Sequence, residues 1–353
     1  MNCAAPVDTI RRGRFAICNP VRRRAVDAGR LAASVSGQTA RGNAMTAPQI
    51  TPKSWAMIAI LGLTWGATFL AIEVALRGIT PFWLAAGRIG FAAAFMTLVW
   101  GWRGATLFTG AERNWTGLVL VGLFNPALPF VLLSWGQQYV TSGFAGVSMA
   151  AVALIVLPLA HFLVPGEAMT PRKTVGFVIG FAGVVVLIGG QAFESSGAEL
   201  ETWGRLAALG AAACYAVSSV YLRRLPPVDP IGLATVLLLI GAAFVVPLAW
   251  IAEGPPPLPP ADTLLWIAGL GLIPTAAANI LRVIVVRSAG PVFMSLVSYQ
   301  VPLWSVLMGA VFLGEPLPPS LLWALALILT GLALSQWGAL RRMFANGSRR
   351  RFG

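Results

Sequence analysis

Long apolar runs separated by short polar joints occupy residues 55–340 of the chain. Each run approaches the roughly 20 residues that an α-helix needs to cross about 30 Å of hydrocarbon. In the first half the runs are residues 55–76, 81–100, 115–137, 141–164 and 173–190. In the second half they are residues 203–222, 231–251, 264–286, 291–313 and 321–340. The pattern predicts an all-α integral membrane protein with ten transmembrane helices, five in each half.

The two halves repeat one sequence pattern at a fixed spacing. Glu167 and Glu315 are 148 residues apart (315 − 167 = 148), and each follows a glycine in a polar turn. The same spacing aligns further landmarks without a gap, namely Pro126 with Pro274 and Gly183 with Gly331. The chain is therefore interpreted as a duplication with repeats at residues 55–190 and 203–340. Because five helices per repeat is an odd number, the second repeat is expected to be inverted relative to the first.

Composition supports the membrane assignment and narrows the possible chemistry. Hydrophobic residues make up 57 % of the chain and charged residues 10 %, whereas soluble domains are about a quarter charged. The formal net charge is +13, but the basic residues lie in joints and tails rather than on one face of a soluble fold. We therefore expect no nucleic-acid partner. The three cysteines show no ligand spacing, so we expect no metal site, and we expect no cofactor.

The positions of the basic joints predict the orientation. If the N-terminus is cytoplasmic, the inner joints hold Lys53, Arg103, Arg113, Arg172, Lys173, Arg223, Arg224, Arg287, Arg341 and Arg342. The outer joints then hold only Arg77 and Arg205 among the basic residues. By the positive-inside rule we expect both termini in the cytoplasm, and a multi-pass location in the plasma (inner) membrane.

The regions outside the repeats are polar. Residues 1–54 form an Arg-rich extension with eight arginines before Met45 and no apolar run of signal-peptide length. We interpret this extension as disordered or as a mis-assigned start, with translation beginning at Met45, and we expect residues 1–44 to be dispensable. A transit peptide is the compositional alternative. Residues 191–202 are expected to be an extracytoplasmic linker, and residues 341–353 a basic cytoplasmic tail.

Two charged residues lie inside the first two predicted helices. Arg88 is seven residues past Pro81 (88 − 81 = 7), which is about 10 Å below the outer surface at 1.5 Å per residue. Glu73 lies near the outer end of the preceding helix. A central arginine costs roughly 2.5–3.5 kcal/mol on insertion scales, so function is one explanation for its presence. Arg88 is then a binding group for an anion or carboxylate, with Glu73 as its resting partner or as a proton-carrying group. The alternative is a fixed ion pair that joins the two helices.

Matching prolines interrupt the third and eighth predicted helices, at Asn125-Pro126 and at Pro274. A proline frees a backbone carbonyl one turn earlier, which only a cavity or a polar neighbour can satisfy. Matching breaks in inverted halves predict a substrate site near the midplane, and a simple packing kink is the alternative. Polar and aromatic residues at compatible depths are further candidates for the same substrate site: Trp65, Phe69, Tyr215, Asn279, Tyr299 and Gln300.

Other polar and small residues are interpreted structurally. Arg282 is five residues from Arg287 (287 − 282 = 5), so its stem can extend to the inner membrane surface. His161 is expected at the membrane surface. Glu167 and Glu315 are each expected to cap the helix that follows them. Small residues four apart are expected to allow close helix packing, in the pairs Gly62–Gly66 and Gly176–Gly180.

Three features resemble the EamA-type transporters of the drug/metabolite transporter superfamily. They are Trp65-Gly66 in the first helix, Arg88 in the second, and the P-x(n)-GE-x(n)-G pattern that ends each half. The resemblance covers about residues 55–340. It implies a secondary transporter that exports a small organic metabolite or amphipathic compound by alternating access. The expected partners are then a small-molecule substrate and the lipid bilayer.

Two other classes are possible for a protein of this composition. An integral-membrane enzyme or a lipid-handling protein without transport activity is the main alternative. Such enzymes use clustered His, Asp or Glu, whereas this chain has one histidine, so we expect no catalytic residues. A passive channel is less consistent with the sequence, which shows no ring of like charges or filter sequence.

Overall fold

The computed structural model describes residues 50–164, 169–190 and 200–349. The chain forms two units, Met1–Ala47 and Pro48–Gly353, and all the described residues lie in the second unit. The predictions for the N-terminal extension before residue 50 and for Glu167 therefore lie outside the described residues.

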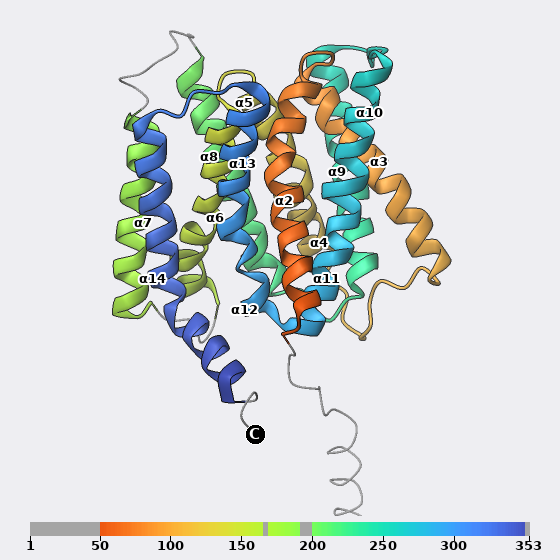
Figure 1. The fold of residues 1–353 in the computed structure, drawn as a ribbon. Coiled ribbons are helices and arrows are strands. Elements are labelled where there is room, and N and C mark those ends of the chain that lie inside the picture. The colour runs from red at the N-terminus through yellow and green to blue at the C-terminus, as the bar shows by residue number, and fades with distance from the viewer. Residues whose placement is uncertain (1–49, 165–168, 191–199, 350–353) are drawn as a thin grey trace, which may run out of the picture. The chain divides into compact units, whose positions relative to one another are not determined.

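The described residues form helices, with one isolated β-bridge between Phe108 and Val228 (Figure 1). The first repeat contains α2 (Pro52–Ala75), α3 (Pro81–Trp102), α4 (Trp115–Gly122), η1 (Leu123–Ala127), α5 (Leu128–Gly136), α6 (Ser142–Leu163) and α7 (Pro171–Gly190). The second repeat contains α8 (Glu201–Leu222), α9 (Pro230–Glu253), α10 (Ala261–Leu270), η3 (Gly271–Ala277), α11 (Ala278–Ala289), α12 (Pro291–Met294), α13 (Val297–Leu313) and α14 (Pro319–Arg349). The segments η1 and η3 are π-helices.

The number of membrane crossings agrees with the sequence prediction. Within the described residues, nine helices are long and apolar enough to cross a membrane, and Val297–Leu313 is a shorter apolar helix. The α4–η1–α5 and α10–η3–α11 segments each form one continuous crossing, Trp115–Gly136 and Ala261–Ala289. The all-helical fold of two five-helix repeats is thus confirmed. One difference is that α14 continues to Arg349, through residues expected to form a polar tail.

The helices begin where the sequence supplies start signals. Thr51, Thr141 and Asp229 each accept a hydrogen bond from a backbone N–H in the first turn of the helix that follows. Proline occupies the start of several helices, as at Pro52 and Pro81, where its missing N–H leaves no bond unmade.

Contacts between the repeats occur in matching pairs. Three contacts join equivalent helices of the two repeats: α3 with α9, α6 with α13, and α7 with α14. The remaining main contacts have counterparts, because α2–α13 matches α6–α8, α5–α8 matches α2–α11, and α4–α8 matches α2–α10. A two-fold axis in the membrane plane that relates inverted repeats requires this pairing. In Figure 1, accordingly, α2 begins at the lower end of this unit and α8 begins at the upper end.

Glycines bring α2 close to α13. A Cβ atom at Gly62 would lie 2.6 Å from Oε1 of Gln300, and one at Gly66 would lie 3.0 Å from the carbonyl oxygen of Val301. Neither position has room for a larger side chain. The predicted packing role of this glycine pair is confirmed.

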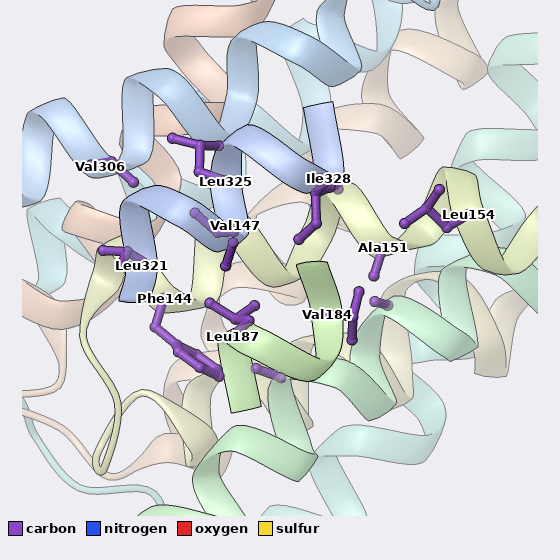
Figure 2. Packing of buried hydrophobic residues seen from close by; sticks show 14 of the residues in the cluster. Phe144, Val147, Ala151, Leu154, Val184, Leu187, Val306, Leu321, Leu325 and Ile328 are labelled. Atoms are coloured by element: carbon purple, nitrogen blue, oxygen red, sulfur yellow. The ribbon is translucent and has the colours of Figure 1, made fainter. Parts of the chain in front are cut away.

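The α7–α14 contact is built in the same way. A Cβ atom at Gly176 would lie 2.6 Å from the carbonyl oxygen of Gly331, and Gly180 faces Leu154 of α6. Beside this contact lies a cluster of buried apolar residues from α6, α7, α13 and α14. Figure 2 shows its labelled members: Phe144, Val147, Ala151, Leu154, Val184, Leu187, Val306, Leu321, Leu325 and Ile328.

Glu315 caps a helix of the other repeat. The backbone N–H groups of Ser142 and Gly143, at the start of α6, donate to its carboxylate at 2.7 and 3.0 Å. The prediction that Glu315 caps the following helix is wrong. That helix, α14, begins after Pro318 with Pro319, and neither residue has an N–H to donate. The first turn of α6 offers the free donors.

Glu253 makes a second contact of this kind at the upper end. It ends α9 in the second repeat, and it accepts hydrogen bonds from the backbone N–H groups of Phe82 and Trp83, both at 3.1 Å. The hydroxyl of Thr80 also donates to it, at 2.5 Å. The N-termini of α3 and α6 are therefore both capped by carboxylates from the second repeat.

Candidate functional site

The candidate site is centred on η3, which lies in the middle of the crossing Ala261–Ala289. Pro274 has no N–H, so the carbonyl of Leu270, four residues earlier, loses its usual donor. The hydroxyl of Thr275 donates to that carbonyl at 2.8 Å. The helix thus widens into a π-helix at the proline, and its own threonine replaces the missing bond.

Three side chains from three helices donate hydrogen bonds to η3. The indole Nε1 of Trp65, on α2, donates to the carbonyl oxygen of Pro274 at 3.0 Å. Nε of Arg88, on α3, donates to Oγ1 of Thr275 at 2.9 Å. Nδ2 of Asn279, on α11, donates to the carbonyl oxygen of Thr275 at 2.5 Å. The structure therefore brings together four candidates from the sequence: Trp65, Arg88, Pro274 and Asn279.

Arg88 is buried, with 7 % of its surface exposed. Its guanidinium carbon lies 3.8 Å from the ring centroid of Phe130, a cation–π contact, and Tyr215 lies close enough to interact with its charge. The expected contact with Glu73, whether as a resting partner or as a fixed ion pair, is wrong. Arg88 bonds instead to Thr275 of the other repeat.

The terminal nitrogens of Arg88 remain available. Among the described residues, only Nε of Arg88 has a hydrogen-bond partner. The two terminal nitrogens are not among the buried atoms that lack a partner, so they are not fully buried. They therefore border accessible space beside η3. An arginine held by Nε and by an aromatic face presents its terminal donors to a ligand in a fixed orientation.

Glu73 belongs to a different polar group near the upper end of α2. Its Oε2 atom is buried without a hydrogen-bond partner, and Glu315 lies close enough for the two carboxylates to repel. Nearby in sequence, the carbonyl of Phe69 accepts a hydrogen bond from Nε2 of Gln137 at 2.9 Å, and Oε1 of Gln137 is buried without a partner. Two of the proposed site residues, Phe69 and Glu73, are thus neighbours here and not at η3.

The remaining candidates are not hydrogen-bonded to η3. In η1, Pro126 packs against Gly241 of α9, and Asn125 is half-buried. On α13, Gln300 packs against Gly62 of α2, and the hydroxyl of Tyr299 is buried without a partner. Among the described residues, no three His, Cys, Asp or Glu side chains come together as metal ligands.

Sequence reasoning missed two polar residues of these groups, Thr275 and Gln137. A signal for Thr275 was present, because a threonine directly after a proline inside an apolar run can satisfy the freed carbonyl. Gln137 gave a weaker signal, since it lies at the end of a predicted helix where polar residues are common.

Within the described residues, nine membrane-length apolar helices and one shorter apolar helix, arranged in two repeats, define a multi-pass membrane protein. The chain belongs to the EamA-like transporter family, whose model matches residues 53–189 and 202–337. It is therefore a membrane transporter.

Several relatives and one solved structure are similar to the chain. The Bacillus subtilis protein described as "Uncharacterized transporter YvbV" is 26 % identical over 290 residues, covering 79 % of this chain and 90 % of the relative. The Escherichia coli K12 protein described as "Uncharacterized inner membrane transporter YedA" is 25 % identical over 292 residues, covering 82 % and 92 %. One crystal structure matches with a TM-score of 0.57 and 24 % identity, covering 81 % of this chain and 97 % of the other, which is a likeness of fold.

Proposed function

We propose that the protein is a secondary transporter of the plasma membrane that exports a small organic solute by alternating access between its inverted repeats. The observation that carries the proposal is the convergence of Trp65, Arg88 and Asn279 on η3, in the middle of a crossing. Polar groups at that depth have a high cost in hydrocarbon, so their convergence favours a solute site.

Each part of this group has a role in the proposal. The terminal nitrogens of Arg88 bind a polar group of the solute, and the rings of Phe130 and Tyr215 provide an apolar wall beside it. Because η1 and η3 interrupt equivalent crossings, they are the positions at which each repeat bends as access changes from one membrane face to the other.

The proposed orientation has both termini in the cytoplasm, so the lower end in Figure 1 faces the cytoplasm. The E. coli relative described as an inner membrane transporter supports the plasma membrane as the location. A reporter enzyme fused to the C-terminus should be active only on the cytoplasmic side. Activity on the opposite side would contradict the orientation.

The second candidate is an integral-membrane enzyme or lipid-handling protein. Acid–base chemistry needs at least one well-placed proton carrier near the bound solute. Glu73, a carboxylate on α2, belongs to a different group from η3 and lies near Glu315. Transport therefore agrees better with the arrangement around η3.

The test is flux of a panel of small organic solutes into liposomes that contain the purified full chain, with and without a proton gradient. Wild-type protein should transport at least one class of solute without altering it chemically. Arg88→Lys should insert normally but show a raised KM, because lysine lacks the bidentate fork. Normal flux in Arg88→Ala would contradict the proposed site. Chemical conversion of a solute or lipid without flux would favour the enzyme.

The double variant Glu73→Ala/Arg88→Ala is a matched control. Because Arg88 bonds to Thr275 and makes no ion pair with Glu73, removing Glu73 should not restore transport to Arg88→Ala. Restored transport in the double variant would show that the two residues act as a pair and would contradict a substrate role for Arg88.

A further inference from the structure

We propose that Glu73, Gln137, Ser142 and Glu315 form a binding site for a monovalent metal cation, Na⁺, near the upper end of α2. The site is separate from the solute group at η3, and the proposed function does not require it. Its basis is a set of buried oxygen atoms without donors, gathered beside two carboxylates.

Three buried oxygen atoms at this end of the protein have no hydrogen-bond partner among the described residues. They are Oε2 of Glu73, Oε1 of Gln137 and Oγ of Ser142. Gln137 is only 2 % exposed, and Ser142 is 0 % exposed. Because buried polar atoms are nearly always bonded, oxygens of this kind point to a ligand.

Ser142 and Glu315 form one side of the site. The carboxylate of Glu315 accepts hydrogen bonds from the backbone N–H groups of Ser142 and Gly143 at 2.7 and 3.0 Å. Oε2 of Glu315 and Oγ of Ser142 both lie within 2.7 Å of the position that a Cβ atom on Gly309 would occupy, so the two oxygens are neighbours. The hydroxyl does not donate to the carboxylate. Lone pairs of both oxygens are therefore available to a cation.

Glu73 and Gln137 form the other side. Nε2 of Gln137 donates to the carbonyl oxygen of Phe69 at 2.9 Å, and Phe69 lies one turn before Glu73 on α2. A long helical side chain lies over the turn that precedes its own Cα. The carboxylate of Glu73 therefore lies over the turn to which the amide of Gln137 is bonded. Oε1 of Gln137 and Oε2 of Glu73 are thus neighbouring acceptors, and neither has a donor among the described residues.

The two sides belong to one group. Glu73 lies close enough to Glu315 for the two carboxylates to repel. Gln137 caps the end of α5 and Ser142 begins α6, five residues later (142 − 137 = 5), so the short connection between these helices keeps them close. Oxygen-bearing side chains from four segments of the chain therefore meet at this end.

The charges in the group favour a single positive charge. The carboxylate of Glu315 faces the N-terminus of α6, whose N–H donors stabilise its charge. Glu73 makes no ion pair among the described residues, although the charge of Arg77 acts on it. Its carboxylate is therefore left beside a like charge in a partly buried place, and a bound cation removes that repulsion.

The ligand atoms favour a metal cation over water or a proton. Carboxylate, amide and hydroxyl oxygens suit hard cations. A water molecule brings no charge, and a proton on Glu73 donates only one hydrogen bond, which leaves other oxygens of the group without a partner. The expectation of no metal site rests on cysteine spacing, which does not bear on oxygen ligands.

The test measures thermal unfolding of the purified full chain in detergent, at constant pH and ionic strength, in chloride salts of Na⁺, K⁺ or N-methylglucamine. At about ten times its dissociation constant, Na⁺ should raise the unfolding temperature by about 2–4 °C relative to N-methylglucamine, because it binds only the folded protein. The shift should saturate with Na⁺ concentration, and K⁺ should give a smaller one.

Glu73→Gln and Ser142→Ala should each lose the Na⁺ shift. Without Na⁺, Glu73→Gln should unfold at or above the wild-type temperature, because the neutral amide needs no cation, whereas a purely structural glutamate would give a lower temperature. Glu253→Gln is the matched control. Glu253 also caps a helix at the upper end, but three donors satisfy its carboxylate, so this variant should keep the Na⁺ shift whatever its basal stability.

Equal shifts in all three salts, or a Na⁺ shift that persists in Glu73→Gln or Ser142→Ala, would overturn the inference. A shift produced by acid and not by Na⁺ would assign a proton to Glu73, and a shift with Ca²⁺ alone would assign a divalent cation; both results would also overturn it. If neither variant folds, binding of radioactive sodium to wild-type protein decides. Saturable binding that unlabelled Na⁺ displaces and N-methylglucamine does not would support the site, and its absence would overturn it.

Discussion

The two π-helices interrupt equivalent crossings but have different surroundings. Both contain a proline at equivalent positions, since 274 − 126 = 148, and both lie within the third crossing of their repeat. Around η1, Pro126 packs against Gly241 of α9. The Cγ atom of Pro126 is 3.0 Å from the position that a Cβ atom on Gly241 would occupy. Around η3, three side chains donate hydrogen bonds to the backbone or to Thr275.

The residues that surround η3 have apolar counterparts around η1. With the same spacing of 148 residues, Trp65 corresponds to Ala213, Arg88 to Val236, Thr275 to Ala127 and Asn279 to Val131. The duplication thus kept the break in both crossings, while among the described residues side chains of other helices donate hydrogen bonds to the break only at η3. The break belongs to the architecture, and the polar group marks where the repeats differ in chemistry.

The largest difference in flux should appear between Arg88→Ala and Val236→Ala, the same change at the equivalent position of the second repeat. Arg88→Ala should lower flux about a hundredfold, because charged donors in such a site contribute about 3 kcal/mol. Val236 is buried among apolar residues, so Val236→Ala should lower stability by about 1–3 kcal/mol and leave flux per inserted molecule unchanged. Flux and thermal unfolding of both variants test this difference. Equal loss of flux would show that the two breaks are functionally equivalent.

A smaller effect is expected for Thr275→Val and the reverse change Ala127→Thr. Valine keeps the shape of threonine but removes the acceptor for Arg88 and the donor to Leu270, so flux should fall about tenfold. Adding a hydroxyl at Ala127 brings no arginine with it and should leave flux unchanged. Initial rates in liposomes measure both, and a normal rate in Thr275→Val would show that Arg88 does not depend on this contact.

Trp65→Phe should have a moderate effect. Phenylalanine keeps the ring but loses the bond to the carbonyl oxygen of Pro274, which is worth about 1 kcal/mol, or about fivefold in flux. Trp55 is a suitable control on the same helix, because it does not bond to η3. Its ring packs edge-on against Phe293, with the two ring centroids 4.9 Å apart. Trp55→Phe should transport normally; a similar loss in both variants would point to packing of α2 rather than to η3.

The smallest difference in flux is expected between Asn279→Ala and Asn125→Ala. Asn279 donates to Thr275, and its loss should lower flux about twofold to threefold, since the acceptor is a backbone carbonyl with a second lone pair. Asn125 has no hydrogen bond among the described residues, so Asn125→Ala should change flux less. A larger effect at Asn125 would place part of the solute site at η1.

Local chemistry explains which of these features the sequence could predict. The breaks at Pro126 and Pro274 were predictable because a missing N–H acts on its own helix, wherever the helix packs. The partner of Arg88 was not predictable, because Thr275 is 187 residues away while Glu73 is near in sequence.

The same limit applies to the carboxylate caps. A glutamate before a helix suggests a cap for that helix, but Glu315 caps α6, 173 residues away in sequence from Ser142. Trp65, Pro274 and Asn279 were proposed on chemistry and are brought together with Arg88. The roles of these residues and of the other candidates in binding stay predictions that flux measurements test.

The caps made by Glu253 and Glu315 have a consequence for how the two repeats depend on each other. At the upper end, four backbone N–H groups of the first repeat donate to carboxylates that only the second repeat supplies. A first repeat expressed alone would lack these four hydrogen bonds. Any movement that parts α3 from Glu253 and α6 from Glu315 would break these four bonds, whereas the hydrogen bonds around η3 involve neither carboxylate.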